Sequence, residues 1–456
     1  MKQAQERILI IDGLKKVGEV VKVAGWVQTV RAHGKIAFFD LRDRSGLLQV
    51  AAFKPEIVKQ ITGLGSQDAV EVYGKVKKRE ERYINKESPA GTIELEAEKV
   101  IVLHKAEEMP FDMGGKELHL ELPTLLDFRS LTLKHETVRM VFTIQAALAD
   151  EFREAAKKLD CTEIFVPTIA AGATEGGAEV FEVNYYGHKA FLTQSPQLYK
   201  QIMVGVFERV YTIAKAYRAE PSVTTRHLSE ATQMDIEIGF IEKFEELLDA
   251  LEFVGTAMIE NVARRYGGIL KRFGVEKPLV PTKVPRLTLR EAQAIVTKRT
   301  GRDLSRELDL NPEDEKEICE WAKKEHESDF VTITHFPTKK RAFYTMPDPK
   351  DPEYSLSYDL LFRGLEILSG SQRIHQYSVL VDKMKEKGVD PKNFGMYLMA
   401  FKYGMPPEGG FSFGLERLTM KLLELTNVRE ASLFPRDMER VDERFSKHEE
   451  KDKQKK

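Results

Sequence analysis

One polar stretch in the middle of the chain carries the residues best suited to binding a phosphorylated ligand. It spans residues 217–230 and holds Arg218, Glu220, Arg226 and His227. Arginine can bind phosphate oxygens through two parallel hydrogen bonds, which lysine cannot do. A solvated surface hairpin would have the same composition, so this stretch alone does not decide the function.

Strands are expected to position this stretch. The run before it, residues 209–214, and the run after it, residues 234–241, are apolar and rich in β-branched residues, whereas turn formers lie between them. This pattern predicts two strands joined by a long polar loop.

Length and composition bound the class of protein. The 456 residues exceed one ordinary core and predict two or three domains, and a composition of 42% hydrophobic and 31% charged residues is globular. No apolar run approaches the roughly 20 residues that span a bilayer, and no secretory signal pattern is present. Cys161 and Cys319 are isolated, which argues against a disulfide framework or structural zinc and predicts a cytoplasmic protein without membrane association.

Charge is divided unevenly along the chain. Residues 1–105 carry 19 Lys and Arg against 14 Asp and Glu, a difference of +5, so the net charge of −2 leaves −7 for the rest. A basic N-terminal part hints at an anionic polymer as partner. A small excess is also common on solvated surfaces.

Residues 1–105 read as a small β domain. Its expected strands are 17–28, 35–42, 46–53, 69–78 and 91–103, with a short helix at 55–60. Five strands with a helix after the third predict an OB barrel, a fold that often binds single-stranded nucleic acid. Alternation places Phe38 and Phe39 on opposite faces, so one can fill the core while the other stacks on a base.

The rest of the chain predicts an α+β domain after a linker. Residues 106–134 read as the linker, 135–440 as the domain and 441–456 as a charged tail that is disordered or loosely helical. Expected helices are 135–159, 243–273, 289–299, 313–324, 379–387, 394–403 and one ending at 425. Expected strands, besides those beside the polar loop, are 162–167, 330–336, 342–346, 354–362, 364–368 and 411–415. The Gly-rich loop 172–179 is either a flexible connection or a lid.

Three signatures stand in order along this domain: a long helix and strand ending at Pro167, the polar loop, and Gly409 to Leu418. They resemble motifs 1, 2 and 3 of the class II aminoacyl-tRNA synthetases. With the OB domain, the resemblance is to subclass IIb and covers nearly the whole chain. It implies an OB barrel followed by an antiparallel-sheet catalytic domain, and a homodimer formed through motif 1.

Further stretches are similar to the archaeal-type aspartate enzymes of that subclass. They are residues 174–177, 194–201 and 369–375. The resemblance implies that ATP and L-aspartate form an adenylate, from which aspartate passes to tRNA(Asp). Activation needs positioning and charge neutralisation, with no protein nucleophile.

The resemblance also assigns nucleotide-binding residues. Arg218, Glu366 and Arg417 would be catalytic, Arg218 holding the α-phosphate and the attacking carboxylate while Arg417 clamps the γ-phosphate. Glu220 would bind the adenine amino group, and Arg226 and His227 the outer phosphates. The remaining ATP-binding positions would be Ala219, Leu228, Gly414, Leu415 and Glu416. Relatives place a Phe for adenine stacking where this chain has Ala231 and Thr232.

A magnesium site and an aspartate site complete the assignment. Asp359, Glu366 and Ser369 would hold Mg²⁺, whose other ligands come from phosphates and water. Lys200 and Arg373 would bind the aspartate side chain, with Glu175, Gln197, Arg218, Asp235 and Ser369 around the rest of the substrate. His375 is either a support for this site or structural. Ser371 stands where many relatives carry Ala.

In the OB domain the resemblance implies that Gln28, Arg31, Phe38 and Gln49 bind the anticodon. Archaeal-type enzymes that reject the asparagine anticodon tend to carry Trp at position 28 and a Lys near residues 88–91, where this chain has neither. The hypothesis is that tRNA(Asn) is charged as well as tRNA(Asp). An asparagine-activating enzyme is the nearest alternative, against which Lys200 argues. A non-catalytic RNA-binding relative is the other, and it would be expected to lose Arg218, Glu366 or Arg417.

Overall fold

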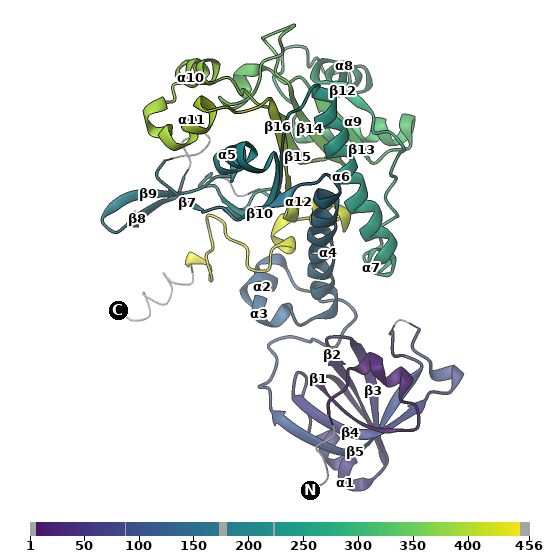
Figure 1. Cartoon of the computed structure of the whole chain (residues 1–456). Coiled ribbons are helices and arrows are strands. Elements are labelled where there is room, and N and C mark those ends of the chain that lie inside the picture. Colours follow the sequence, from purple (N-terminus) through teal and green to yellow (C-terminus); the bar gives the residue numbers. More distant parts are fainter. Residues whose placement is uncertain (1–5, 87, 173–179, 222–223, 447–456) are drawn as a thin grey trace. The chain divides into compact units, whose positions relative to one another are not determined.

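The computed structural model describes residues 6–86, 88–172, 180–221 and 224–446, which fall into two compact units divided between Leu120 and Glu121 (Figure 1). The predicted linker therefore contributes residues 106–120 to the first unit and 121–134 to the second. Of the predicted 172–179 loop only Gly172 is described, so Glu175 lies outside the described residues.

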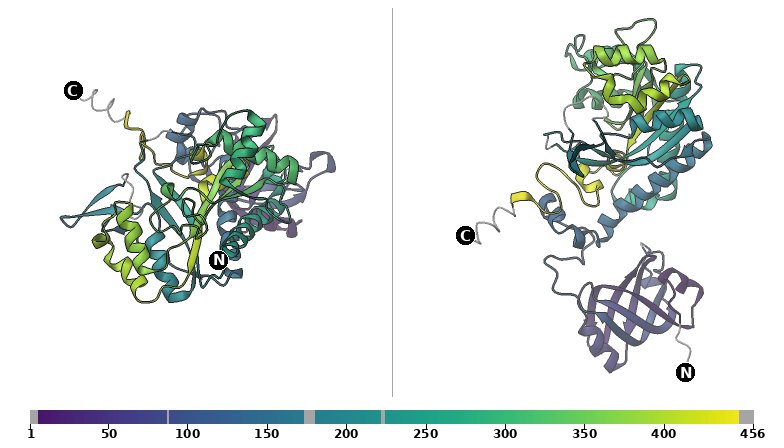
Figure 2. Two further views of the ribbon diagram at one scale, coloured as in Figure 1. Left: turned by 90° about the horizontal axis from the view of Figure 1, so that it is seen from above. Right: turned by 60° about the vertical axis from the view of Figure 1, so that its left-hand side comes forward.

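The first unit is a closed five-stranded barrel, the OB fold expected from the sequence. Its strands are β1 (Val20–His33), β2 (Ile36–Asp43), β3 (Gly46–Ala52), β4 (Ala69–Lys78) and β5 (Ile93–His104), with α1 (Pro55–Thr62) after β3. Their order around the barrel is β1-β2-β3-β5-β4, and β4 pairs with β1 to close it. Figure 2 shows this unit at the purple end of the colour scale. Alternating apolar residues fill the interior of the barrel. Phe39, Val50 and Leu95 among them are fully buried.

An eight-stranded sheet organises the second unit. Its strands are β6 (Thr162–Glu163), β10 (Arg209–Tyr217), β11 (Glu230–Gly239), β12 (Arg286–Thr288), β13 (Phe330–Thr334), β14 (Ser357–Phe362), β15 (Leu365–Gln372) and β16 (Glu408–Gly414). They lie in the order β12-β13-β14-β15-β16-β11-β10-β6 and pair antiparallel except at the two edges, where β12/β13 and β10/β6 are parallel. The antiparallel sheet expected for this fold class is confirmed.

The two faces of this sheet differ in polarity. On β11 the even-numbered residues Met234, Ile236 and Ile238 join the apolar core, whereas Asp235 and Glu237 point to the other face. The apolar face is covered by α4 (Glu136–Lys158), α6 (Phe244–Arg265) and α12 (Leu415–Leu422), whose buried residues share one cluster with the sheet (Figure 1). Period-two alternation thus separates a structural face from a polar face.

Two smaller cores flank the sheet. One contains residues of α5 (Gln197–Phe207), α10 (Tyr377–Glu386) and α11 (Gly395–Lys402). The other contains residues of α8 (Leu289–Thr300), α9 (Pro312–His326) and β13. α7 (Gly267–Arg272) follows α6, and a small sheet is formed by β7 (Ile169–Ala170), β9 (His188–Leu192) and β8 (Glu182–Tyr185). None of the helices within the described residues is long and apolar enough to span a membrane.

Three expectations about individual elements were wrong. The linker contains two short helices, α2 (Leu122–Asp127) and α3 (Arg129–Thr132). They were missed because each is too short for its apolar residues to show a helical period. Residues 342–346 form no strand. Phe343 and Tyr344 instead pack into the core near α5 and α10, and a single bridge joins Thr345 to Arg373. The strand expected at 162–167 ends at Glu163, and Phe165 beyond it is 90% exposed.

The start of the charged tail is also ordered. Arg440 is buried, and both Arg440 and Arg444 form ion pairs with Asp127 at the end of α2. Nearby, Arg129 donates to the backbone carbonyls of residues 430, 432 and 433. Arg129 and Arg440 are thus buried charges paired across more than 300 residues of sequence, and they hold the chain just before the predicted tail against α2 and α3.

Candidate functional site

A pocket of about 310 Å³ lies on the polar face of the central sheet. It brings together most of the predicted ATP- and aspartate-binding residues, which come from α5, the 217–230 loop, β11, β15, β16 and α12. They are Gln197, Lys200, Arg218, Glu220, Arg226, His227, Leu228, Asp235, Glu366, Ser369, Arg373, Gly414, Glu416 and Arg417. Ala219, Asp359, Leu415 and His375 are not part of the lining.

Main-chain hydrogen bonds hold the polar loop at both of its described ends. The Arg218 N–H donates to the Ser229 carbonyl at 2.9 Å, and the Ser229 N–H donates to the Arg436 carbonyl at 2.9 Å. Further along, the Val428 N–H donates to the Thr225 carbonyl at 2.9 Å, and Arg417 Nε donates to the Arg226 carbonyl at 3.3 Å. Most of these partners of the loop therefore come from residues 417–436, near the end of the second unit.

Charged side chains on this loop remain available to a ligand. Among the residues that the structure describes, the Arg218 guanidinium and the Glu220 carboxylate have no hydrogen-bonded partner, and both line the pocket. His227 Nδ1 lies 2.6 Å from Thr224 Oγ1. Desolvation lowers the pKa of His227, and the neighbouring Arg417 lowers it further, so this histidine is neutral near pH 7.

The residues of motif 3 divide between ligand-facing and structural positions. Gly414 and Arg417 line the pocket, whereas Leu415 is buried in the apolar core. Both oxygens of Glu416 accept from the Thr232 N–H, at 3.1 and 2.9 Å, which ties α12 to β11. Leu228, Ala231 and Val428 add apolar lining in place of the missing stacking phenylalanine.

The predicted magnesium residues lie on adjacent strands. Asp359 of β14 and Ser369 of β15 are cross-strand partners, and Arg341 donates to both, at 2.8 Å to Asp359 Oδ2 and 3.2 Å to Ser369 Oγ. The other oxygen of Asp359 is buried and has no partner among the described residues. Glu366 lies 3.8 Å from Arg417, and desolvation followed by the nearby Asp359 raises the pKa of Glu366 to about 7.

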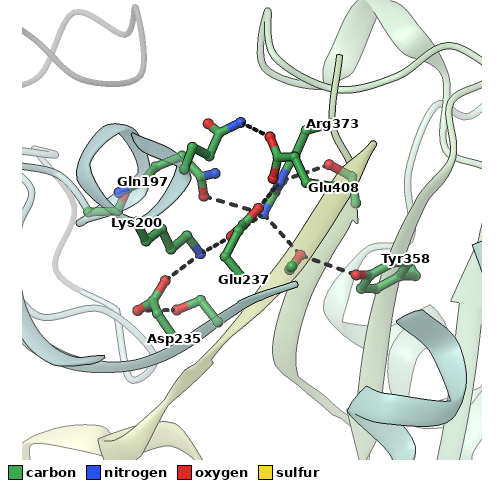
Figure 3. A network of polar contacts seen from close by, with 12 residues as sticks. Gln197, Lys200, Asp235, Glu237, Tyr358, Arg373 and Glu408 are labelled. Carbon is green, nitrogen blue, oxygen red and sulfur yellow. Dashed lines mark hydrogen bonds and ion pairs between the residues drawn. The ribbon is translucent and has the colours of Figure 1, made fainter. Parts of the chain in front are cut away.

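A network of buried charges lies at one end of the pocket, and three of its members line the pocket (Figure 3). We name Lys200, Asp235, Glu237, Arg373 and Glu408 the buried cluster, since each is at most 4% exposed. Lys200 Nζ lies 2.7 Å from Asp235 Oδ1 and 3.0 Å from Glu237 Oε2. Arg373 Nε lies 2.7 Å from Glu237 Oε1, so Glu237 bridges the two cations.

Burial and charge shape the pKa values of these carboxyl groups in opposite directions. Desolvation raises the pKa of Asp235 even though Lys200 opposes it. Desolvation would also raise the pKa of Glu237, but Arg373 and Lys200 together outweigh it and lower that pKa. The pKa of Glu408 is well above its usual range because of desolvation and then the negative Glu237. Of the three carboxyl groups, Glu408 thus has the surroundings that most favour the protonated form.

Neighbouring side chains orient Arg373. Its Nη1 donates to Ser371 Oγ at 2.6 Å, and its Nη2 donates to the Gly410 carbonyl at 2.9 Å and to Gln197 Oε1 at 3.3 Å. The serine that replaces alanine in many relatives thus acts as a hydrogen-bond acceptor here. Gly410 has no room for a side chain, because an added Cβ would lie 2.3 Å from Glu237 Oε2.

Sequence reasoning did not select several polar residues in and around this site. Arg341 lines the pocket, whereas Glu237, Glu315 and Glu408 lie behind its lining and bind Lys200, Arg226 and Gln201. The position of Glu237 could have been found, since it follows Asp235 by two residues on a strand and must share its face. Glu408 directly precedes the third signature, whereas Glu315 and Arg341 lie outside all three and are brought there only by the fold.

The barrel gathers three of the four predicted anticodon residues on one surface. Arg31 is the cross-strand partner of Phe38, and Gln49 is the partner of Asp40, two residues beyond Phe38. Arg31 Nη2 donates to both oxygens of Asp40, at 3.1 and 3.0 Å. Phe39 is fully buried in the barrel, whereas Phe38 is partly exposed.

Gln28 lies apart from that surface. It sits where the register of β1 and β2 shifts, between Val27 and Val30, and it lines a separate hollow formed with residues 106–114. Gln49 is held by Arg79, which donates to its Oε1 at 3.0 Å, and by Glu94, which accepts from its Nε2 at 3.1 Å. Arg79 and Glu94 are further polar residues on this surface that sequence reasoning did not select.

Family comparison agrees with the division into two units. An OB-fold nucleic acid binding domain matches residues 21–103, and the class II tRNA synthetases of the D, K and N group match residues 121–438. The chain belongs to this family of class II tRNA synthetases. It is thus an aminoacyl-tRNA synthetase built from an OB barrel and a class II catalytic domain.

Individual relatives narrow the likeness to the aspartate enzymes. The chain is 42% identical over 441 residues to the aspartate–tRNA(Asp/Asn) ligase of Thermus thermophilus, covering 95% of this chain and 99% of the relative. It is 40% identical to the aspartate–tRNA(Asp) ligase of Pyrococcus furiosus, and the match covers 93% of this chain and 96% of the relative. Among solved structures, it is similar to the Entamoeba histolytica aspartyl-tRNA synthetase, with a TM-score of 0.84, 30% identity and coverage of 96% and 93%. The chain is also similar to the solved asparaginyl-tRNA synthetase of Pyrococcus horikoshii, with a TM-score of 0.85 and 29% identity. That match covers 94% of this chain and 97% of the other.

Proposed function

We propose that this protein is an aspartate–tRNA ligase, which activates L-aspartate with ATP and transfers it to tRNA. The observation that carries the proposal is the set of donors left open in the buried cluster. Within the described part of the chain, Lys200 uses two of its three N–H groups on Asp235 and Glu237, and Arg373 keeps one Nη1 hydrogen free after binding Ser371. Two cationic donors facing one pocket match the two oxygens of a side-chain carboxylate.

The same geometry disfavours asparagine. An amide presents one acceptor and one N–H₂ donor, so its donor end would meet an N–H of Lys200 or Arg373 instead of an acceptor. Buried donors left unpaired are costly, which turns a small chemical difference into strong discrimination. Gln197 Nε2 is buried and unpartnered within the described residues, and we assign it to the main-chain groups of the substrate together with Asp235.

On the nucleotide side we assign Arg218 to the α-phosphate and the attacking carboxylate. Its guanidinium lines the pocket without a partner in the described part of the chain, as a residue that stabilises developing charge should. Glu220 binds adenine, Arg226 and Arg417 bind the outer phosphates, and neutral His227 donates or accepts one hydrogen bond there. The presence of Arg218, Glu366 and Arg417 in one pocket argues against a non-catalytic relative.

The donor set on β14 and β15 fits Mg²⁺. Asp359 has a buried oxygen without a partner among the described residues, and desolvation, with a further contribution from the negative Asp359, raises the pKa of Glu366. A divalent cation would give the Asp359 oxygen a partner and offset the negative charge beside Glu366, with Ser369 as a further ligand. When bound, it would neutralise charge on the phosphates. No group of three His, Cys, Asp or Glu side chains suited to a metal occurs in the described ranges, so phosphates and water must supply the other ligands.

ATP–pyrophosphate exchange tests the amino-acid assignment. The purified protein should catalyse exchange that depends on aspartate, while asparagine at the same concentration supports at most a small fraction of that rate. Exchange with asparagine but not with aspartate would overturn the proposal.

The anticodon assignment rests on the surface that holds Arg31, Phe38 and Gln49. Stacking of a base on an aromatic ring contributes about 1–3 kcal/mol. Phe38→Ala should therefore leave the exchange rate unchanged and lower kcat/KM for tRNA charging by about tenfold or more. Since Phe38 is partly exposed, the variant should stay folded, and equal losses in both assays would count against an anticodon role.

For the tRNA partner we propose that tRNA(Asn) is charged as well as tRNA(Asp). Gln28 in place of tryptophan supports this relaxed choice, and relatives of similar identity carry both kinds of name. Charging of both purified tRNAs with labelled aspartate is the test, and a strong preference for tRNA(Asp) would refute the proposal.

Assembly and location complete the proposal. We infer a homodimer through motif 1, because the edge strand β6 is short and Phe165 beside it is 90% exposed. Sedimentation at several concentrations would test it. We keep 1–105 as the anticodon-binding domain and 135–440 as the catalytic domain. Two free, buried cysteines are compatible with action in the cytoplasm.

A further inference from the structure

One carboxylate outside the three motifs lies behind the pocket and pairs with Arg226, which lines it. Glu315 lies in the first turn of α9, a helix that Asn311 caps through bonds to the N–H groups of residues 313 and 314. Its side chain is 12% exposed and forms an ion pair with Arg226 Nη2. The main-chain N–H of Glu366 also interacts with this carboxylate. Glu315 thus connects the polar loop to the strand that carries the metal residue.

Arg226 is fixed on one side and open on the other. Its Nη2 is held by Glu315, and its carbonyl accepts from Arg417 Nε at 3.3 Å. Among the described residues, Nε and Nη1 of Arg226 have no partner, and the side chain lines the pocket. A planar guanidinium that is held at one nitrogen therefore presents its remaining N–H groups to a ligand in a set orientation.

We propose that Glu315 is a positioning residue for ATP, which holds the Arg226 guanidinium ready for the outer phosphates. This inference rests on the proposed function, because it takes ATP as the ligand of the pocket. It makes the helical segment of α8 and α9 part of the nucleotide site, although no motif lies in it.

Physical reasons favour this role over simple ion pairing. Only 12% of the Glu315 side chain is exposed, and a buried carboxylate needs a charged partner, so its pair with Arg226 is held closely. A free arginine would lose much rotamer freedom on binding phosphate. An arginine already held by Glu315 loses less, so binding is stronger for ligands that carry the outer phosphates.

The test compares two ligands on one variant. Glu315→Gln should weaken ATP binding, measured by calorimetry, by about tenfold, the factor expected for a charged hydrogen bond. A stable sulfamoyl analogue of aspartyl-adenylate has no outer phosphates, so its affinity should change by less than about twofold. The control is Glu317→Gln on the same helix, which removes a pair with Arg299 away from the pocket and should alter neither affinity.

A double variant then asks whether Glu315 acts through Arg226. Arg226→Gln with Glu315→Gln should bind ATP as weakly as Arg226→Gln alone, because the effects of coupled residues do not add. Equal weakening of ATP and the analogue, tighter ATP binding, or additive losses would each overturn the proposal. Aspartate-dependent exchange by the unmodified protein, measured alongside, separates such a result from failure of the proposed function.

Discussion

At the buried end of the pocket, Lys200 and Arg373 already hold carboxylates, whereas at the loop end the Arg218 guanidinium has no partner among the described residues. The difference follows from solvent. A cation that is 1–4% exposed must be paired within the protein, while a partly exposed one can wait in water for its ligand. Under the proposed function, the buried end would supply shape and specificity, and the loop end would supply charge to the reaction.

If this division is correct, Arg218→Ala should damage catalysis without damaging the fold. We expect aspartate-dependent exchange to fall by about a thousandfold, the loss seen when one preorganised charge donor is removed. The free energy of unfolding, measured with urea, should change by less than about 0.5 kcal/mol because no described partner is left unpaired. A large loss of stability would erase the contrast between the two ends.

Glu237→Gln should produce the opposite pattern. Removing the charge that bridges Lys200 and Arg373 leaves two buried cations under-compensated, which should cost about 3 kcal/mol of unfolding free energy and also lower exchange. Thermal and urea unfolding provide the measurement. A variant that unfolds at the same denaturant concentration as the unmodified protein would mean that the cluster is not an ionic network.

Glu408→Gln is the matched variant with the smallest expected effect. Glu408 is protonated when folded, so an amide can replace it, accepting from Gln201 and donating to Glu237. Exchange should stay within about twofold of the unmodified rate.

The same variant has a signed pH effect on stability. Because the pKa of Glu408 is raised on folding, its protonated form stabilises the folded state near pH 4.5, and this contribution is lost as pH rises toward the folded pKa. In urea unfolding at pH 5, 6.5 and 8, the free energy of unfolding should fall less steeply with pH for the variant than for the unmodified protein. An unchanged slope would mean that Glu408 is ionised in the fold.

Much of the architecture could be predicted from local pattern. The strand at 69–78 and the helix after β3 were found because alternation, apolar period and Pro55 act within a few residues. The strand expected at 342–346 failed because Phe343 and Tyr344 are buried in an irregular segment, which β-propensity cannot distinguish from a strand.

The site shows the same limit. Lys200 and Arg373 could be selected because motifs mark their positions, although their assigned roles stay predictions. Nothing near Glu315 or Glu408 in sequence indicates that they meet Arg226 or Gln201, since these contacts span 89 and 207 residues. Long-range pairing of single charges leaves no periodic trace, so only the fold reveals it.

The pairing of Asp127 with Arg440 has a consequence for how the protein is made. The two residues are 313 positions apart, and the Ser229 N–H of the polar loop likewise donates to the Arg436 carbonyl. During synthesis α2, α3 and the polar loop are therefore translated well before the residues that pair with them, and remain without those partners until then. A nascent chain can complete the barrel of its first unit early, but it cannot close its catalytic unit until the segment from Arg436 to Arg440 has left the ribosome.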